Sequence, residues 1–304
     1  MVDITHKSNT LRIAKAQAIV EVSRPETIAA IESKNIPKGD LFEISRAAGL
    51  LAVKQTANVI PDCHPIPIEY TGVSYQIDDL QITISIEVKT IYKTGVEVEA
   101  MHGASVIALT MYDMLKPIDK GVLVKEIKLI EKKGGKSQYR NQKGNHLKAA
   151  VIVCSDSISA GTKKDRAGLV IREKLEGFGV QVMDYTIIPD EAEEIEKMVF
   201  KAYDENFNLL IFTGGTGLSP RDVTPDVIRP LLDREIPGIA ETARSYGQDR
   251  IPYAMLSRSI AGVKGETLIL TLPGSTKGAS ESMDALFPHI LHVFGILKGS
   301  RHEG

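Results

Sequence analysis

The stretch Leu209–Asp226, LLIFTGGTGLSPRDVTPD, decides the fold of the second half of the chain. It begins with an apolar run, which is typical of a parallel-sheet strand buried on both faces. Thr213–Gly217, with the sequence TGGTG, follows directly, and its glycines allow a tight turn that directs backbone N–H groups toward an anion. Thr224 and Pro225 then indicate the start of a helix, with Thr224 as the N-cap. The stretch predicts a strand–loop–helix unit of an open α/β sheet, in which ligands bind at the carboxyl ends of the strands.

The glycine loop has a second interpretation, a tight connection that binds nothing, because short glycine motifs are weak evidence for a ligand. Arg221 and Asp222 follow the loop directly, and a simple turn needs neither charge. We therefore expect a phosphate-bearing ligand here, contacted by Thr213, Gly214, Gly215, Thr216 and Gly217.

The rest of the second half alternates between strand and helix patterns. The predicted strands are Ala149–Cys154, Val180–Ile187, Asn208–Phe212 and Thr267–Leu272. The predicted helices are Ala167–Gly177, Ala192–Asp204, Val223–Leu232, Ile239–Tyr246 and Lys277–Leu297. This alternation predicts an α/β domain with a doubly wound, mostly parallel sheet.

Polar loops follow several of these strands, and in a parallel sheet they meet at one edge. Asp190 follows the second strand, and a late strand leads into a helix through Pro273, Gly274 and Ser275, which is a favourable place for an anion. Taken alone, Asp190 is expected to cap the helix that begins at Ala192. Taken together, the loops indicate a phosphate site in which Asp190 and Asp222 hold Mg²⁺, since its preferred ligands are oxygens. Asp156 and Asp165 are weaker candidates.

The first half has a different order of elements. Its predicted strands are Leu11–Val22, Ile68–Ile77, Leu80–Thr90 and Val122–Ile130. Its predicted helices are Arg24–Ser33, Leu41–Val59 with Asp40 as the N-cap, and Glu97–Met114. Paired strands interleaved with helices predict an α+β domain with an antiparallel sheet and helices on one face.

The segment Lys132–Lys148, KKGGKSQYRNQKGNHLK, has the composition of a linker, with almost no apolar residue. We expect a first domain over residues 1–140 and a second over residues 148–304, with the boundary near residues 139–147.

Charge and cysteine content exclude several classes of protein. A formal net charge of −2 gives no electrostatic reason to expect nucleic acid or an anionic membrane as a partner. The chain has two cysteines, so a disulfide framework is not expected and a reducing compartment fits. The sequence has no apolar run of transmembrane length and no signal pattern at its start, which predicts a cytoplasmic protein.

Each polar cluster of the first half has two interpretations. His64, between Cys63 and Pro65, is either an ordinary loop histidine or a ligand contact; a zinc site lacks further ligands at suitable spacing, and a thiol nucleophile at Cys63 lacks an orienting partner. Asp113 and Lys116 are three residues apart on one helix face, so they form either a surface ion pair or an acid/base pair.

Glu97 and Glu99 likewise either complement the dipole of the first helical turn or bind a ligand. The order of the motifs decides between these interpretations. Those motifs are MVDI (residues 1–4), KGD (38–40), CHP (63–65), KTGVEVE (93–99), MYDM (111–114) followed by Lys116, and KGGKS (133–137).

This half resembles cyclic pyranopterin monophosphate synthase, the MoaC family of molybdenum cofactor biosynthesis, over about residues 1–138. The resemblance implies a ferredoxin-like subunit assembled as a hexamer of dimers, with each active site at a subunit interface. It also implies the conversion of 3′,8-cyclo-7,8-dihydro-GTP to the cyclic pyranopterin with loss of pyrophosphate.

The family's functional residues fall on matching positions of this chain. The resemblance implies that Asp113 and Lys116 are the acid/base pair. It places Lys38, His64 and Lys132 at the triphosphate or the ring, and Glu97 and Glu99 near the purine-derived ring; Cys63 joins these substrate contacts. Lysine and histidine suit a polyphosphate, and carboxylates accept hydrogen bonds from a guanine-like edge.

The second half resembles the MoaB/MogA group of molybdopterin-binding proteins over about residues 148–298. The motifs are TGGTG followed by SPRDVTP (219–225), IPDE (188–191), LSR (256–258) and LPG (272–274). Active members of this group adenylate molybdopterin with Mg-ATP, and their catalytic aspartates match Asp190 and Asp222. Other members bind the pterin without a settled activity, so a non-catalytic pterin-binding or scaffold domain is the alternative.

These resemblances imply a bifunctional enzyme of molybdenum cofactor biosynthesis, acting on small pterin and purine-derived substrates. They imply a homo-oligomer, based on a hexamer or a trimer, with Mg²⁺ and ATP used by the second domain. A third interpretation treats both halves as an interaction protein whose assembly matters more than its sites.

Overall fold

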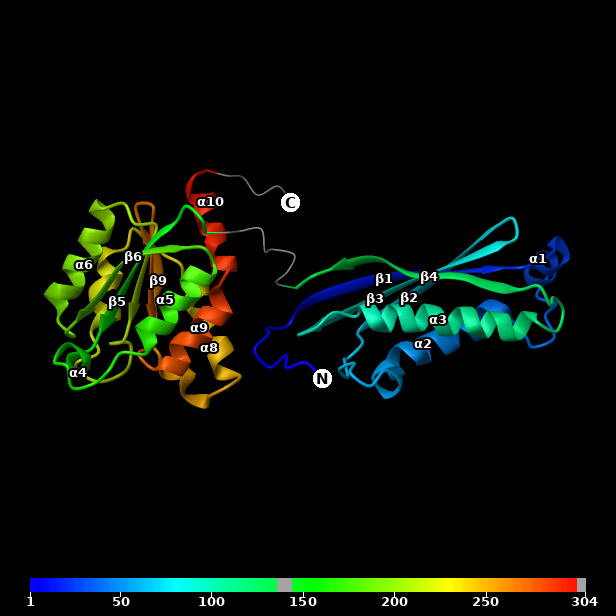
Figure 1. Cartoon of the computed structure of the whole chain (residues 1–304), viewed down its shortest axis with the longest axis horizontal. Helices are drawn as coiled ribbons and strands as arrows, with labels where there is room; N and C mark the ends of the chain where they lie inside the picture. Colours follow the sequence, from blue (N-terminus) through cyan, green and yellow to red (C-terminus); the bar gives the residue numbers. More distant parts are fainter. Residues whose placement is uncertain (136–143, 300–304) are drawn as a thin grey trace. The chain divides into compact units, whose positions relative to one another are not determined.

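The computed structural model describes residues 1–135 and 144–299, and the chain divides into two compact units, residues 1–138 and 139–304 (Figure 1). The expected domain boundary at residues 139–147 falls largely outside the described residues. Each unit has its own hydrophobic core, so each is described by itself.

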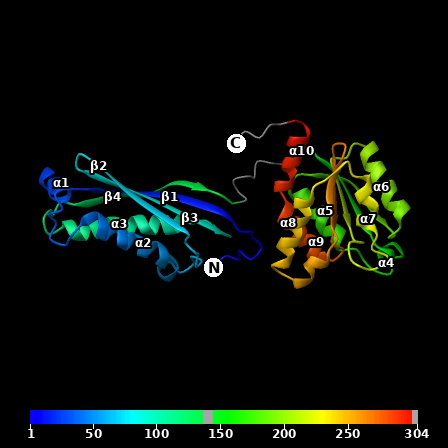
Figure 2. The same cartoon turned by 180° about the vertical axis from the view of Figure 1, so that it is seen from behind.

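The first unit is an antiparallel sheet covered by helices on one face (Figures 1 and 2). Its sheet order is β2-β3-β1-β4. The elements follow one another as β1 (Thr10–Glu21), α1 (Pro25–Glu32), α2 (Leu41–Val59), β2 (Tyr70–Asp78), β3 (Gln81–Tyr92), α3 (Glu97–Leu115) and β4 (Leu123–Lys133). The expected antiparallel α+β arrangement is therefore present.

Alternation along the central strands β1 and β3 builds this core. Every second residue points to the helices and is buried: Ala14, Ala16, Ala18 and Val20 on β1, and Ile82, Ile84, Ile86 and Val88 on β3. Asp40 begins α2 as expected, since its Oδ1 accepts hydrogen bonds from the N–H groups of Phe42 and Glu43.

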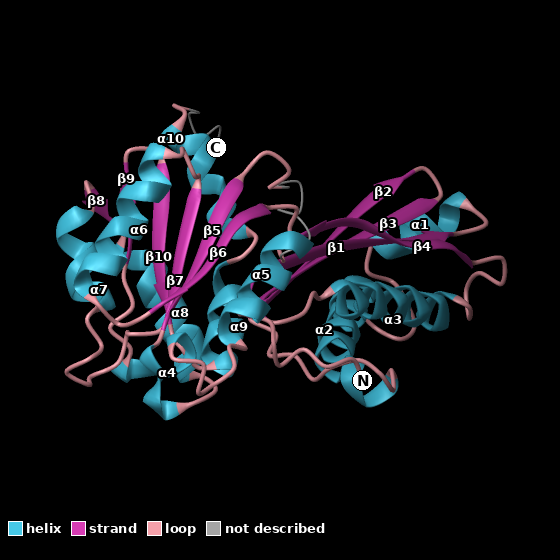
Figure 3. Cartoon of the chain, turned by 60° about the vertical axis from the view of Figure 1, so that its left-hand side comes forward, coloured by secondary structure: helices cyan, strands magenta, loops and turns pink. Residues whose placement is uncertain are grey.

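The second unit is an α/β domain with a mostly parallel sheet of order β6-β5-β7-β10-β9-β8 (Figure 3). Strands β6, β5, β7 and β10 are parallel, and β9 and β8 are antiparallel. The strands are β5 (Lys148–Cys154), β6 (Gln181–Ile188), β7 (Leu209–Thr213), β8 (Arg234–Glu235), β9 (Ala261–Lys264) and β10 (Thr267–Leu272). The helices are α4 (Asp156–Ser159), α5 (Ala167–Gly177), α6 (Ala192–Asp204), α7 (Thr224–Ile228), α8 (Pro237–Gln248), α9 (Thr276–Leu286) and α10 (Val293–Leu297).

Helices cover both faces of this sheet, as a doubly wound fold requires (Figure 1). Helices α5, α8, α9 and α10 pack against one face, together with Val151 and Ile211. Helices α6 and α7 pack against the other, together with Ile152 and Phe212. Successive residues of one strand thus enter different cores, which explains why these strands are continuous apolar runs.

Three predictions about this unit are wrong in detail. The helix expected over Lys277–Leu297 ends at Leu286, and a 3₁₀ turn and α10 follow, because Pro288 has no N–H to continue the helix. The helix expected over Val223–Leu232 ends at Ile228, just before Pro230, and continues only as a 3₁₀ turn. Thr224 is the first residue of α7 and not its N-cap, which is Val223.

The short antiparallel strands β8 and β9 were not predicted, because stretches of two and four residues carry no recognisable periodicity. Among the described residues, no helix combines the length and the apolar character needed to cross a membrane.

Candidate functional sites

Asp113 lies between two lysines near the end of α3. Its Oδ1 is 2.7 Å from Nζ of Lys116, and its Oδ2 accepts a hydrogen bond from Nζ of Lys38 at 2.6 Å. Lys38 also donates to the main-chain oxygen of Asp113 at 3.0 Å. We call these three residues the lysine–aspartate cluster. The structure thus brings together one carboxylate and two amines from the turn before α2 and the end of α3.

Charge pairing in this cluster fixes the protonation of its members. Lys116 and then Lys38 lower the pKa of Asp113 to about 2. The hydrogen bond from Lys116 to Asp113 raises the pKa of Lys116 in turn. The half-exposed cluster therefore presents a carboxylate and an ammonium group side by side, the base form of one and the acid form of the other.

A second group of predicted residues lies at the other end of α3. The thiol of Cys63 donates to Oε1 of Glu99 at 3.1 Å, and Glu99 is 2% exposed. His64 and Glu99 both line a cavity of about 380 Å³, and Nε2 of His64 is 2.9 Å from the main-chain oxygen of Val2. The structure thus places His64 and Glu99 at one cavity, with Cys63 hydrogen-bonded to Glu99.

Burial controls the ionisation of this second group. Burial, followed by the hydrogen bond to Glu99, raises the pKa of Cys63 to about 12, so the thiol stays protonated and the nucleophile interpretation loses its basis. Burial also raises the pKa of Glu99, whose Oε2 is buried without a hydrogen-bond partner among the described residues. A buried acceptor without a donor is suited to an N–H group of a ligand.

Glu97 lies two residues before Glu99 on α3, and its charge contributes to the raised pKa of Glu99. Nζ of Lys132, on β4, is 3.4 Å from Oε1 of Glu97. The side chain of Glu97 folds back over Gly95, where a β-carbon would lie 1.9 Å from its Oε2. We call Cys63, His64, Glu97, Glu99 and Lys132 the carboxylate pocket.

The lysine–aspartate cluster and the carboxylate pocket are far apart within one chain. Glu99 is in the first turn of α3 and Asp113 in its last, 14 residues later. At about 1.5 Å of rise per residue they are separated by roughly 20 Å. The structure therefore does not bring together all the site residues predicted for the first half.

The glycine loop of the second unit lies where the sequence placed it, after β7. Gly214 and Gly215 have φ angles of +105° and +60°, which glycine adopts without strain. A β-carbon on Gly214 would lie 2.1 Å from the carbonyl oxygen of Cys154, and one on Gly274 would lie 3.0 Å from Cα of Gly214. The hydroxyl of Thr213 donates to the carbonyl of Pro273 at 2.8 Å. Strands β5, β7 and β10 therefore meet at this loop.

Asp190 and Asp222 both approach the glycine loop. A β-carbon on Gly215 would lie 3.0 Å from Oδ1 of Asp190, and one on Gly217 would lie 2.9 Å from Oδ2 of Asp222. Burial, and then the nearby charges of Asp156 and Asp222, raise the pKa of Asp190 despite a hydrogen bond from the Asp156 N–H. Asp190 does not cap α6, whose N-cap is Glu191, so the interpretation as a simple cap is wrong.

The donor set at the loop fits a divalent cation. Oδ1 of Asp190 is buried without a hydrogen-bond partner among the described residues, and the charge of Asp222 acts on the same carboxylate. Within the described ranges no cluster of three or more metal-ligating side chains occurs. Mg²⁺ is compatible with this, since it often takes one or two carboxylates and completes its shell with water and substrate phosphate.

Pro273 and Ser275 line a cavity of about 190 Å³ beside the glycine loop, opposite Arg244 and Tyr253. Ser275 also caps α9, because its hydroxyl accepts a hydrogen bond from the N–H of Gly278 at 3.2 Å. The cavity therefore adjoins the loop through Gly274.

Sequence reasoning missed Arg258, although its motif was noted. Nε of Arg258 donates to the carbonyl of Gly217 at 2.7 Å, and Nη1 contacts Asp226 at 2.7 Å. Arg258 lies in the irregular segment between a 3₁₀ turn and β9, where the sequence gave no local signal for this role. Asp165, a weak candidate, is instead structural: its carboxylate accepts hydrogen bonds from the Gly168 N–H and the Tyr185 hydroxyl.

Both halves of the chain match known families. A family model described as the MoaC family matches residues 1–135, and one described as "Probable molybdopterin binding domain" matches residues 150–292. The two matches cover the first and second units in turn.

Similar proteins carry both halves or one of them. The Molybdenum cofactor biosynthesis bifunctional protein of Chlorobaculum tepidum is 41% identical over 302 residues, covering 99% of this chain and 96% of that protein. The Cyclic pyranopterin monophosphate synthase of Clostridium perfringens is 45% identical over 139 residues, covering 45% of this chain and 87% of the synthase. The solved structure of the molybdopterin biosynthesis enzyme MoaB from Thermus thermophilus is 44% identical, covering 50% of this chain and 97% of its own, with a TM-score of 0.48.

Proposed function

Because this chain belongs to the family of molybdenum cofactor biosynthesis bifunctional proteins, we propose that its two units catalyse two separate steps on pterin compounds. The first unit converts 3′,8-cyclo-7,8-dihydro-GTP to cyclic pyranopterin monophosphate and releases pyrophosphate. The second binds molybdopterin and transfers an adenylyl group to it from Mg-ATP. The observation that carries the first assignment is Asp113 held between Lys38 and Lys116.

In the first reaction the lysine–aspartate cluster supplies proton transfer. Asp113 is ionised at neutral pH and can accept a proton, while Lys116 carries one that it can donate to a leaving oxygen. Lys38 adds a second positive charge for the phosphate chain. At the carboxylate pocket, the unpartnered oxygen of Glu99 accepts a hydrogen bond from the N–H edge of the purine-derived ring.

Two copies of the chain complete each first-unit site. The cluster and the pocket are about 20 Å apart on one α3, which is too far for one substrate to be bound and transformed by both. A twofold axis that brings one chain's cluster to the other chain's pocket removes this separation. The order β-α-α-β-β-α-β, which is a β-α-β-β-α-β unit with one added helix, supports a ferredoxin-like subunit, and we propose a homo-oligomer with hexameric first units and trimeric second units.

In the second reaction the chain's own residues position two phosphate-bearing molecules. The glycine loop holds the terminal phosphate of molybdopterin beside the α-phosphate of ATP, and the cavity lined by Pro273 and Ser275 takes the pterin. Asp190 and Asp222 are the residues that would hold Mg²⁺, which neutralises the charge that develops on the phosphoryl oxygens. Pyrophosphate leaves when the new phosphate–phosphate bond forms.

One pair of variants in the full chain tests whether the two reactions belong to different units. Asp113→Asn is expected to lower pyrophosphate release from the cyclised GTP by about 100-fold or more, because it removes the base, and to leave molybdopterin-dependent ATP turnover intact. Asp222→Asn is expected to do the reverse. Each variant is the folding control for the other.

The outcomes separate the alternatives for the second unit. Tight molybdopterin binding without ATP turnover in the wild-type chain would identify the second unit as a carrier or scaffold. Turnover that persists at the wild-type rate in Asp222→Asn would remove this aspartate from the mechanism. Full first-unit activity in Asp113→Asn would overturn the assignment of the cluster.

A further inference from the structure

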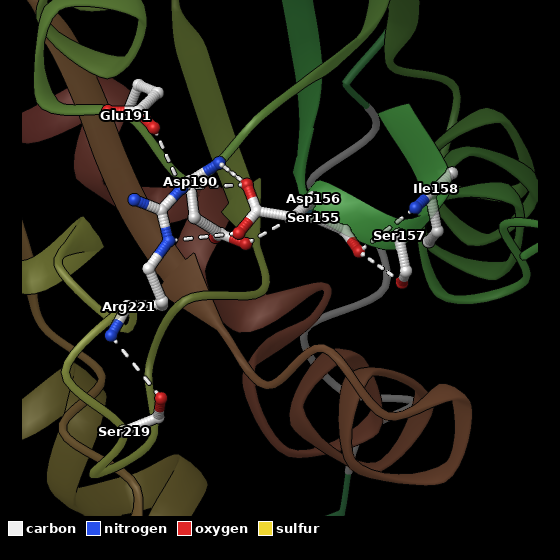
Figure 4. A network of polar contacts seen from close by, with 8 residues as sticks. All are labelled: Ser155, Asp156, Ser157, Ile158, Asp190, Glu191, Ser219 and Arg221. Atoms are coloured by element: carbon white, nitrogen blue, oxygen red, sulfur yellow. Dashed lines mark hydrogen bonds and ion pairs between the residues drawn. The ribbon is translucent and has the colours of Figure 1, made fainter. Parts of the chain in front are cut away.

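Asp190 is held by a network that reaches across three loops of the second unit (Figure 4). The loops follow β5, β6 and β7, and they contribute Asp156, Asp190 with Glu191, and Arg221. Of these residues, Asp190 is the one whose carboxylate lies close to Gly215 of the glycine loop, since a β-carbon added to Gly215 would meet it. Asp156 contacts Asp190 and Arg221 contacts Asp156, so the effect that we propose for them on a ligand passes through Asp190.

Asp156 and Asp190 exchange a pair of hydrogen bonds. The N–H of Asp156 donates to Oδ2 of Asp190 at 3.1 Å, and the N–H of Asp190 donates to Oδ1 of Asp156 at 3.0 Å. This exchange occupies Oδ2 of Asp190, while Oδ1 is buried with no hydrogen-bond partner in the described part of the chain and lies 3.0 Å from the β-carbon position of Gly215. The two oxygens of one carboxylate thus have different roles.

Arg221 fixes the plane of the Asp156 carboxylate. Its Nε donates to Oδ2 of Asp156 at 3.0 Å and its Nη2 to Oδ1 at 2.9 Å, a two-pronged contact that restrains rotation. Nη2 also contacts Glu191 at 2.8 Å. Ser219 accepts a hydrogen bond from the Arg221 N–H at 3.3 Å, which ties the arginine to the turn after the glycine loop.

The local structure around Asp156 supports the same geometry. Ser155 precedes it as the N-cap of α4, with Oγ accepting from the Ile158 N–H at 3.4 Å. The N–H of Ser155 donates to the carbonyl of Ile188 at 3.0 Å, which joins the ends of β5 and β6. These two hydrogen bonds of Ser155 therefore hold the backbone at Asp156 in place.

We propose that Asp156 and Arg221 are positioning residues that hold Asp190 with its Oδ1 toward the glycine loop and the bound cation. The proposal rests on the function proposed above, in which Asp190 holds Mg²⁺. Asp156 and Arg221 themselves contact neither cation nor substrate. Without them the Asp190 side chain is free to rotate, and its unpartnered oxygen no longer has a fixed direction.

Direct binding of Mn²⁺ to the full chain tests this, with electron paramagnetic resonance as the readout. Asp156→Ala and Arg221→Gln are each expected to weaken Mn²⁺ binding by about tenfold, as loss of a residue that supports a metal ligand does. Asp190→Asn replaces the charged ligand with a neutral amide and should abolish binding. Glu191→Gln is the matched control, because it removes an Arg221 partner but leaves the Asp156–Asp190 exchange intact, and it should change the affinity by less than about twofold.

Amide hydrogen exchange at Asp190 provides a second readout that needs no metal. The Asp190 N–H should exchange faster in Asp156→Ala, because its acceptor is gone, while the amides of β7 keep their protection in a folded protein. Wild-type Mn²⁺ affinity in Asp156→Ala, with binding lost in Asp190→Asn, would overturn the proposal.

Absence of Mn²⁺ binding in the wild type would instead contradict the metal role in the proposed function. In that case, amide hydrogen exchange by itself tests whether Asp156 positions Asp190. Faster exchange in Asp156→Ala then supports it, and unchanged exchange overturns it.

Discussion

Individual carboxylates in this chain differ in function because they differ in the donors around them. Asp113 has two ammonium donors and stays ionised and accessible. Asp190 has one oxygen satisfied and one left buried and unpartnered, which suits a cation. Asp119, at 1% exposure, has all its acceptor sites satisfied and is structural. The same functional group is therefore proposed as a base at Asp113 and as a metal ligand at Asp190, and it is a structural anchor at Asp119.

The ionised carboxylate of Asp119 is predicted to stabilise the first unit at neutral pH, and this stabilisation is predicted to disappear in acid. It accepts hydrogen bonds from the Ser23 hydroxyl, from the N–H groups of Ser23 at 2.8 Å and Gly121 at 2.9 Å, and from the Thr27 hydroxyl at 2.9 Å. Burial raises the pKa of Asp119, but these bonds outweigh burial and hold the pKa at about 2. Since the folded pKa is below the unfolded value of about 3.9, this stabilisation is full above pH ~4 and is lost as pH falls toward 2.

Urea unfolding of wild type and Asp119→Asn checks this. The variant should be less stable by about 2 kcal/mol at pH 7, and the difference should shrink steadily below pH 4. The exposed Asp78→Asn is the control and should match the wild type. A difference that stays constant from pH 7 to pH 2 would show that the charge of Asp119 is not what stabilises the fold.

At the scale of elements, α3 organises the first unit. It packs on the sheet and on α2, and it carries Glu97 and Glu99 at its start and Asp113 at its end. A rigid helix of this length holds the two parts of the site at a fixed separation. The close packing of α2 on α3 uses glycines, since a β-carbon on Gly103 would lie 2.6 Å from Cγ2 of Val53.

Gly103→Val is therefore predicted to destabilise the first unit by about 1–3 kcal/mol, because the added methyl groups overpack the contact between α2 and α3. Calorimetry should show a lower melting temperature for one transition, with the transition of the second unit unchanged, since each unit has its own core.

The matched control is Gly177→Ala at the end of α5, where a β-carbon has no atom within 4 Å. It should be neutral or slightly stabilising, because alanine favours the helix more than glycine does. If Gly103→Val melted like the wild type, the contact between α2 and α3 would have to be loose.

At the scale of the whole molecule, the two units share a chain but no described core residue. The proposed division of function is consistent with this, because each unit has its own core and its own candidate site residues. For the first unit, the separation along α3 is the basis of the proposal that two chains form one catalytic site.

Subunit complementation tests this requirement. Asp113→Asn lacks a working lysine–aspartate cluster, and Glu99→Gln lacks a working carboxylate pocket, so each alone should be inactive in pyrophosphate release. Mixed chains form hybrid dimers in which one of two sites has a wild-type cluster and a wild-type pocket. Random mixing should restore about a quarter of the wild-type activity, since half the dimers are hybrid and half their sites are intact.

The control is a mixture of Asp113→Asn with Lys116→Ala, two changes in the same cluster, which should stay inactive. If the Asp113→Asn and Glu99→Gln mixture also stayed inactive while hybrid dimers formed, both parts of the site would have to come from one chain.

The sequence by itself determined the order and type of nearly every element. Alternation along β1 and β3 indicated a sheet with one buried face, and the apolar run at β7 indicated a strand buried on both. The glycine loop and the Asp40 cap were also predictable, because glycine spacing and capping act over a few residues. Where Pro230 and Pro288 fell inside a predicted helix, their local effect was underestimated.

Tertiary structure alone decided which atoms meet. The bonds from Lys38 to Asp113 and from Arg221 to Asp156 join residues 75 and 65 positions apart, and no local pattern encodes them. The same is true of the oxygen of Asp190 that stays unpartnered among the described residues, whereas the separation between cluster and pocket follows from the length of α3. Periodicity and capping depend on neighbours along the chain, whereas a site depends on side chains that only folding brings within hydrogen-bond distance.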